Sequence, residues 1–168
     1  MTRTFRTAAV VLMTTLALTG CAAGAPEPTP TAGGSEESGP CEQVSIVVDF
    51  GVLDEPAVDA CGEAGVALES LAAAGITTEG TEDYGDQVVC RVNDQPAPDE
   101  PVTIEGQEPF VEACQTLNAT AYWAVWVKTA ADSEWEYAQE GVNTLQLDDG
   151  QSLGLVYTPG TDSTPPRD

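Results

Sequence analysis

The stretch that decides the fold runs Val44-Ser45-Ile46-Val47-Val48-Asp49-Phe50. Its apolar positions Val44, Ile46, Val48 and Phe50 recur every second residue, with Ser45 and Asp49 between them. Because successive side chains of a strand point to opposite faces, this period predicts a β-strand with one buried face. The turn-forming residues after Phe50 indicate a wide turn and at most a short return strand before Cys61.

One helix is expected after this strand. Between residues 62 and 74 the apolar positions recur at helical spacing, and Gly75 is placed to end the helix in a left-handed cap. Later strands are predicted over residues 87–92, 121–128 and 135–138, with short strands at 76–78 and 102–104. Residues 145–147 and 152–157 flank Asp149-Gly150, which predicts a closing hairpin.

The order strand, helix, then several strands is typical of an α+β domain. The specific expectation is a beta-grasp-like mixed sheet with one main helix packed on one face. No internal repeat is evident in the sequence.

The charge balance excludes several classes of protein. The chain has 168 residues, with 5 Lys and Arg against 28 Asp and Glu and no histidine, so its formal net charge is -23. Nucleic-acid binding needs clustered cations, which this sequence lacks. Histidine is the commonest general base, and no other pairing of nucleophile and base is evident. We therefore expect a protein that is not an enzyme and has no cofactor and no nucleic-acid partner.

The sequence also predicts no metal site. The acidic stretch over residues 79–86 offers oxygen ligands for calcium, but it lacks EF-hand spacing, and a solvated acidic turn is the favoured interpretation.

The N-terminus has the pattern of an export signal. Residues 1–20 combine Arg3 and Arg6 with a short apolar stretch that is too short to span a bilayer. They end in Leu18-Thr19-Gly20-Cys21, which resembles the lipobox of bacterial lipoproteins. This resemblance implies a signal peptide over 1–20 and acylation of Cys21, for example with palmitate, on the extracytoplasmic face of the cell membrane. The alternative is an ordinary signal sequence followed by an incidental cysteine.

Composition divides the rest of the chain. After Cys21 the chain up to residue 40 holds only Ala, Gly, Pro, Glu, Thr and Ser, so residues 21–40 are predicted to be a lipid-anchored flexible tether. Residues 159–168 are similarly rich in Pro, Gly, Thr and Ser and are predicted to be a disordered tail. The folded domain is therefore expected over residues 41–158.

Four cysteines remain in that domain: Cys41, Cys61, Cys90 and Cys114. An even number in an exported domain predicts two disulfides, with three possible connectivities. Cys41 and Cys61 are equally far from Gly51, so a hairpin turning there would join them and leave Cys90 to pair with Cys114. This gives a preference among the three connectivities.

A set of motifs resembles the transcobalamin C-terminal-like domain of secreted and lipid-anchored bacterial proteins. It comprises residues 44–51, the helix at 67–75, Val89-Cys90-Arg91-Val92, Tyr122-Trp123-Ala124-Val125-Trp126, Trp135-Glu136-Tyr137 and the closing Asp148-Asp149-Gly150 with Val156-Tyr157. The resemblance covers about residues 44 to 157. It implies a soluble-ligand-binding relative of the beta-grasp fold, with a corrinoid as the ligand, although the helical domain that completes corrinoid sites in transcobalamins is absent from this chain.

The aromatic residues supply the predicted ligand site, which consists of Tyr122, Trp123, Trp126, Trp135 and Tyr137. On a strand Trp123 points to one face while Tyr122 and Trp126 point to the other, so one set packs in the core and the other is suited to stacking on a ligand. The favoured function is a membrane-anchored lipoprotein that binds a small soluble ligand for a membrane transporter. The alternative is a cell-envelope module that recognises a protein or glycan and transports nothing.

Overall fold

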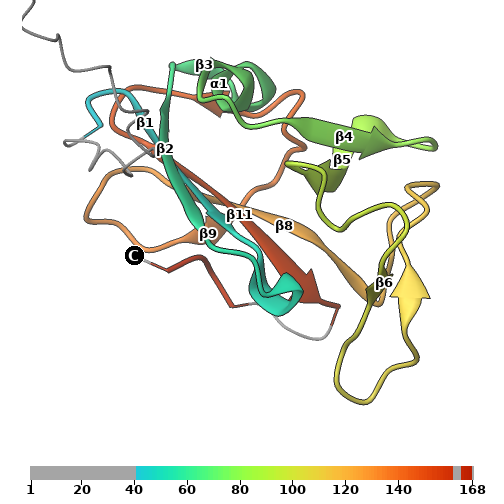
Figure 1. The fold of residues 1–168 in the computed structure, drawn as a ribbon. Coiled ribbons are helices and arrows are strands. Elements are labelled where there is room, and N and C mark those ends of the chain that lie inside the picture. The colour runs from blue at the N-terminus through green and yellow to red at the C-terminus, as the bar shows by residue number, and fades with distance from the viewer. Residues whose placement is uncertain (1–40, 161–163, 168) are drawn as a thin grey trace, which may run out of the picture. The chain divides into compact units, whose positions relative to one another are not determined.

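The computed structural model describes residues 41–160 and 164–167. The predicted signal peptide, the predicted lipidation site Cys21 and the tether over 21–40 lie outside the described residues. A five-stranded sheet forms the centre of the domain (Figure 1), with the strand order β2-β1-β11-β8-β9. Its strands are β1 (Val44–Asp49), β2 (Val58–Gly62), β8 (Ala121–Lys128), β9 (Glu136–Tyr137) and β11 (Ser152–Pro159). Strand β11 runs parallel to β1 and antiparallel to β8.

Three two-stranded pairs surround this sheet. They are β3 (Gly65–Val66) with β10 (Gln146–Leu147), β4 (Thr78–Thr81) with β5 (Gly85–Val92), and β6 (Pro101–Val102) with β7 (Phe110–Val111). A 3-10 turn, η1 (Gly51–Leu53), follows β1. One α-helix, α1 (Ala67–Ala73), occurs among the described residues. This mixed composition confirms the expected α+β class.

Helix α1 is shorter than predicted at its start and ends as predicted. Gly62 ends β2 and residues 65–66 form β3, so only seven residues are helical. Gly75 has a φ of 76°, its N–H donates to the Ala72 carbonyl, and the Ile76 N–H donates to the Leu71 carbonyl. These two bonds form a Schellman motif, which satisfies carbonyls that the end of a helix otherwise leaves unpaired.

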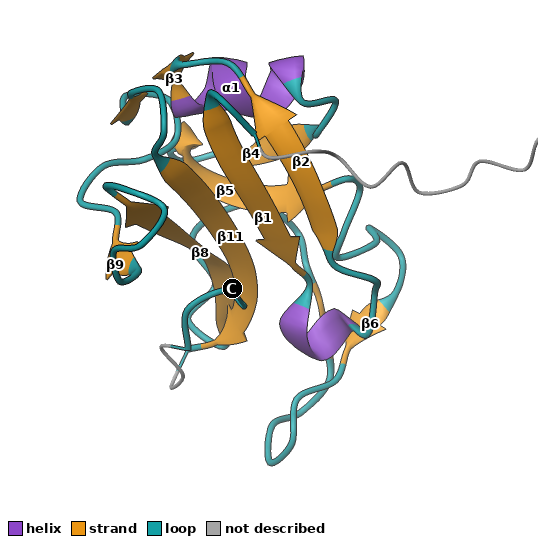
Figure 2. Ribbon diagram, turned by 90° about the vertical axis from the view of Figure 1, so that its left-hand side faces the viewer, coloured by secondary structure: helices purple, strands orange, loops and turns teal. Residues whose placement is uncertain are grey.

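The two faces of the sheet have different coverings. The inner face, which carries Val44, Ile46 and Val48, packs against α1 and the β4–β5 hairpin and forms the main core. The outer face carries the alternate residues of the same strands, such as Ser45 and Val47. Figure 2 shows β4 and β5 behind the sheet and the chain's C-terminus in front of β11.

The predicted closing hairpin is wrong. A turn does form, with Gly150 at a φ of 84°, but β10 pairs with β3, and β11 enters the centre of the sheet between β1 and β8. The Gly150 N–H donates to the Gln43 carbonyl, and the Ser45 N–H donates to the Gln151 carbonyl, so this turn is bonded to the start of β1. Strand β11 finds partners on both edges there, whereas a hairpin with the two-residue β10 would leave most of its backbone unpaired.

Both disulfides join the cysteines that the sequence favoured. Cys41 pairs with Cys61, with a Cα–Cα distance of 5.6 Å, because the β1–β2 hairpin brings them to its open end. Cys90 of β5 pairs with Cys114, with a Cα–Cα distance of 5.5 Å. The second bond ties the irregular stretch after β5 back to that strand.

Candidate functional site

Strand β8 divides its aromatic side chains between the two faces of the sheet. Trp123 lies in the inner-face core, where it is 4% exposed and meets Phe50 and Tyr157 edge-on, with ring centroids 5.4 Å apart in each pair. Its indole N–H donates to the Gln95 carbonyl at 3.2 Å. Trp123 is therefore a core residue, and the structure separates it from the other four residues of the predicted ligand site.

Those four residues lie together on the outer face, and we call them the outer aromatic cluster: Tyr122, Trp126, Trp135 and Tyr137. Trp126 is paired with Tyr137 across β8 and β9, and their ring centroids are 4.1 Å apart. The hydroxyls of Tyr122 and Tyr137 are 3.3 Å apart. The Lys128 ammonium lies 4.9 Å from the centre of the Trp135 ring, where the negative face of the indole attracts it.

The outer aromatic cluster contains two buried donors without acceptors. The indole N–H groups of Trp126 and Trp135 are buried, and neither has a hydrogen-bond partner among the described residues. An unpaired buried donor is costly, so an acceptor that reached either group would be stabilised. Two such donors therefore lie within one cluster of packed aromatic rings.

A hollow opens beside the cluster. It has a volume of about 890 Å³ and is bounded by Ser45 and Val47 of β1, by Ser152 of β11 and by the loop after β8. Lys128 and Arg167 line it together with Asp132 and Glu134, so it presents both signs of charge. Trp135 lies at the boundary between the hollow and the outer aromatic cluster.

The C-terminal segment, residues 164–167, lies against this face. Pro166 is buried, and a Cβ placed on Gly154 of β11 would lie 2.3 Å from its Cγ atom. Arg167 forms an ion pair with Asp59 of β2 at 2.7 Å. The sequence predicted a disordered tail over 159–168, whereas β11 includes Pro159 and residues 164–167 have defined contacts. Residues 161–163 and 168 lie outside the described part of the chain.

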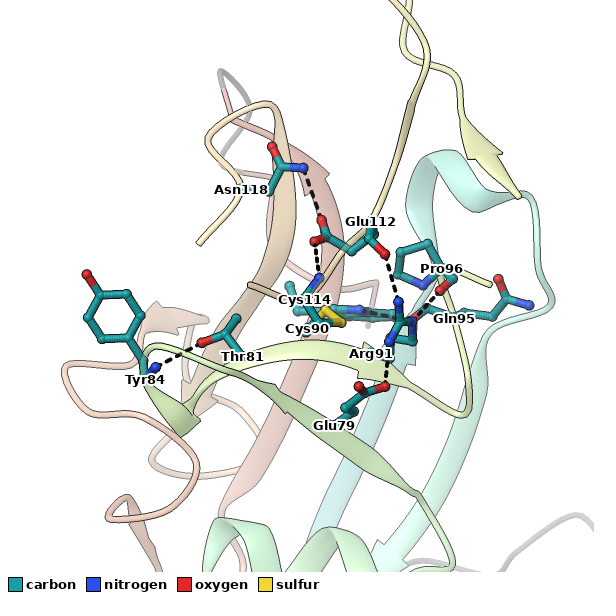
Figure 3. Close-up of a disulfide and its surroundings, with 11 residues drawn as sticks. Glu79, Thr81, Tyr84, Cys90, Arg91, Gln95, Pro96, Glu112, Cys114 and Asn118 are labelled. Atoms are coloured by element: carbon teal, nitrogen blue, oxygen red, sulfur yellow. Dashed lines mark hydrogen bonds and ion pairs between the residues drawn. A yellow bond between two sulfur atoms is a disulfide. The ribbon is translucent and has the colours of Figure 1, made fainter. Parts of the chain in front are cut away.

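A buried polar network lies beside the Cys90–Cys114 disulfide (Figure 3). Arg91 is 9% exposed and donates to the carbonyls of Pro96 and Glu112 and to the Glu79 carboxylate. The Glu112 carboxylate in turn accepts from the Cys114 N–H and from the Asn118 amide. Every partner is a strand or loop of the protein itself, so the arrangement anchors the long loop to β5.

The same region does not form a metal centre. Cys90, Glu112 and Cys114 have their ligating atoms within 4.8 Å of one another, but both sulfurs are bonded in the disulfide and offer no thiolate. Glu79, one of the acidic residues considered as a calcium ligand, is paired with Arg91.

Sequence reasoning missed two residues that shape the outer face, Gly154 and Pro166. A signal for Gly154 was present, because an isolated glycine inside a strand pattern marks a place where another group approaches closely. Pro166 lay within a stretch whose composition indicates disorder, and only the folded sheet shows its contact.

Comparisons with known proteins give no assignment. No family model matches the chain, and neither the curated proteins nor the solved structures include a match. Among the described residues, no helix has the length and apolar character needed to cross a membrane. A functional assignment therefore depends on the outer face itself.

Proposed function

We propose that this chain is a lipid-anchored lipoprotein on the extracytoplasmic face of a bacterial cell membrane, and that its folded domain binds a small soluble ligand for uptake. The observation that carries the proposal is the open hollow beside the outer aromatic cluster. Its volume of about 890 Å³ falls in the range of roughly 300–1,000 Å³ that small-molecule sites occupy. The Trp135 ring and Lys128 line the hollow and offer such a ligand an aromatic surface and a cation.

The strand order supports the finer assignment of a beta-grasp domain. In that fold a helix follows the first hairpin, and the first and last strands lie side by side and parallel at the centre. Helix α1 follows the β1–β2 hairpin, and β1 is parallel to β11. This arrangement agrees with the resemblance to the transcobalamin C-terminal-like domain, from which a corrinoid follows as the ligand.

A tryptophan-fluorescence titration of the full-length protein with cobalamin and cobinamide tests the ligand. After correction for corrinoid absorbance, we expect saturable quenching that Trp135→Ala weakens about tenfold or more, since Trp135 borders the hollow. Tyr84→Ala is the matched control, because Tyr84 is 52% exposed in the turn between β4 and β5. A flat corrected titration would remove corrinoids as ligands.

The anchor has its own test. We expect cells fed labelled palmitate to label the protein and to retain it in the membrane fraction, and Cys21→Ala to abolish both. Labelling that survives in Cys21→Ala would contradict the anchor and leave ligand binding to be judged separately.

The second candidate is a cell-envelope interaction module that recognises another protein and transports nothing. One observation favours it, which is that a peptide segment, the C-terminal segment, already lies on the outer face. Capture of the protein from solubilised membranes discriminates the two candidates. Co-purified transporter subunits support the first, and co-purified cell-wall proteins support the second.

A further inference from the structure

The C-terminal segment occupies the outer face as a peptide ligand would occupy a groove. Pro166 is buried, while Thr164, Pro165 and Arg167 on either side of it are exposed. A proline fixes its own φ and biases the preceding residue toward an extended conformation, so Thr164 and Pro165 favour an extended backbone. One buried ring between exposed neighbours is the pattern of an extended peptide docked through one side.

Pro166 packs over Gly154 and beside Trp135, and we call this place the seat. It depends on Gly154 having no side chain. Gly154 lies opposite Trp126 in the β8–β11 pairing, and a Cβ at residue 154 would lie 2.3 Å from Pro166 Cγ and 3.1 Å from Trp135 Cζ3. The Pro166 ring and the edge of the Trp135 indole thus share the space above this glycine. Since Lys128 lies over the Trp135 ring, the indole is held in place beside the seat.

The outer aromatic cluster, to which Trp135 belongs, contains donors that suit a proline-rich segment. Proline has a carbonyl and no N–H, so a proline-rich chain presents acceptors without competing donors. The buried indole N–H groups of Trp126 and Trp135 are donors with no acceptor in the described part of the chain, which includes residues 164–167. The C-terminal segment therefore fills the apolar seat but leaves both donors unpaired. A segment that also reached these donors would bind more tightly.

The charges around the seat favour a basic residue after the prolines. Arg167 donates to the Asp59 carboxylate at 2.7 Å, and Asp132 and Glu134 line the adjoining hollow. The chain as a whole has 28 acidic against 5 basic residues. Complementary charge of this kind increases the rate of association and discriminates against acidic partners.

We propose that the outer face is a recognition groove for an extended segment of a partner protein in which a basic residue follows two prolines. Pro165, Pro166 and Arg167 occupy the groove as an intramolecular ligand. Aromatic-lined grooves bind proline-rich segments in this way because the extended segment loses little conformational entropy on binding. The inference rests on the interaction-module function proposed above and names the chemistry of its partner.

An intramolecular ligand makes binding competitive. A partner segment binds only the fraction of molecules in which the C-terminal segment has left the seat, and its apparent affinity falls by that fraction. Weakening the resident segment should therefore strengthen binding of the partner without changing the groove.

Full-length protein and a blocked peptide with the sequence Thr-Asp-Ser-Thr-Pro-Pro-Arg-Asp, which is that of residues 161–168, provide the test. Isothermal titration measures the affinity of this peptide for wild type and for Pro166→Ala. We expect Pro166→Ala to bind the peptide about tenfold or more tightly than wild type does. Pro98→Ala is the matched control, because Pro98 is an exposed proline in the loop after β5 and does not line the hollow.

Further variants locate the binding. In the Pro166→Ala background, we expect Gly154→Ala to abolish peptide binding by filling the seat, and Trp135→Ala to abolish it by removing one wall. A peptide with alanines in place of both prolines should not bind. Thermal unfolding shows whether each variant is folded, and Trp135→Phe, which keeps an aromatic ring without the N–H, provides a milder change if the alanine variant is unfolded.

The outcomes distinguish a failure of the peptide-groove inference from a failure of either proposed function. No peptide binding to folded Pro166→Ala, or equal binding to wild type and Pro166→Ala, overturns the inference. Capture of cell-wall proteins that persists in folded Trp135→Ala also overturns it while keeping the interaction module. Saturable corrinoid quenching without peptide binding overturns it and supports the small-ligand function instead.

Discussion

The buried hydroxyl of Tyr157 destabilises the folded state. It is 1% exposed in the inner-face core, and no described residue bonds its hydroxyl. We expect Tyr157→Phe to raise the free energy of unfolding by about 1 kcal/mol, because an unpaired buried hydroxyl is removed while the ring remains. Urea unfolding at neutral pH measures the change. A loss of about 1 kcal/mol or more would mean that this hydroxyl has a bonding partner.

The same residue sets part of the response to alkali. Burial, and to a smaller extent the charge of Glu112, raises the pKa of the Tyr157 phenol above its ordinary value. In the unfolded chain a tyrosine loses its proton near pH ~10. Above that pH the phenol loses its proton in the unfolded state but keeps it in the folded state, so stability falls as the pH rises toward the folded-state pKa. Below the unfolded-state pKa this loss of stability is absent. Melting temperatures of Tyr157→Phe should therefore fall less steeply above about pH 10 than those of wild type. Tyr84→Phe, at an exposed tyrosine, should behave like wild type.

Arg91 joins three other parts of the chain through its buried guanidinium. Its three guanidinium bonds end on two buried carbonyls and on Glu79. Arg91→Met would leave those acceptors unpaired, and we expect it to lower the free energy of unfolding by about 3 kcal/mol. Arg91→Lys keeps the charge without the planar guanidinium, so its free energy of unfolding should lie between those of wild type and Arg91→Met.

The matched control for Arg91 is Arg167→Met. Arg167 is part of an exposed ion pair with Asp59, and such pairs contribute about 0–1 kcal/mol. Equal losses for the two methionine variants in urea unfolding would show that the Arg91 network adds no more than a surface pair.

At the scale of the elements, α1 depends on its C-terminal cap. Gly75 has a φ of 76°, and nothing lies within 4 Å of the place that a Cβ would occupy, so a side chain there meets a backbone penalty and no collision. We expect Gly75→Ala to lower the free energy of unfolding by about 1 kcal/mol. Gly75→Asn should recover part of this loss, because asparagine tolerates the left-handed region. Thermal unfolding of both variants tests the expectation, and an unchanged Gly75→Ala would contradict it.

The elements that the sequence predicted best are those with a clear period. Strand β1 and strand β8 have the predicted positions because their alternation or apolar run is bounded by turn residues, and Gly75 marks the end of α1. The partner of β11 was not predictable from local pattern. The Asp149-Gly150 signal is correct as a turn, but a turn does not show which distant strand lies next to the one that follows it.

At the scale of the whole molecule, the Cys90–Cys114 bond and the Arg91 network hold the same long loop. We expect the double variant Cys90→Ala/Cys114→Ala to lose about 3 kcal/mol, since the bond closes a loop with a sequence separation of 24 residues. When Arg91→Met is added to this double variant, the total loss of unfolding free energy should be smaller than the sum of the two separate losses, because both changes release the same loop. Additive losses in urea unfolding would show that the bond and the network act independently.

The candidate site could be predicted only in part, because segments far apart in the sequence meet on the outer face. Alternation along β8 correctly separates Trp123 from Trp126, but whether the outer face is open depends on residues 164–167, which lie 38 to 41 positions after Trp126 in sequence. Long-range packing of this kind leaves no period in the sequence.

The central place of β11 also governs when this domain can fold. Until residues 152–159 have left the ribosome, the rest of the sheet consists of two separate pairs, β1 with β2 and β8 with β9. Without β11, the inner edges of β1 and β8 are unpaired in addition to the outer edges of β2 and β9, and these inner edges are open to mispairing with other chains. Among the described strands β11 comes last in the chain and joins the two pairs, so the sheet cannot form before residues 152–159 are available and should form slowly for a domain of this size. A chain that stops short of β11 has two additional exposed edges and no complete sheet, which makes premature termination a direct route to aggregation.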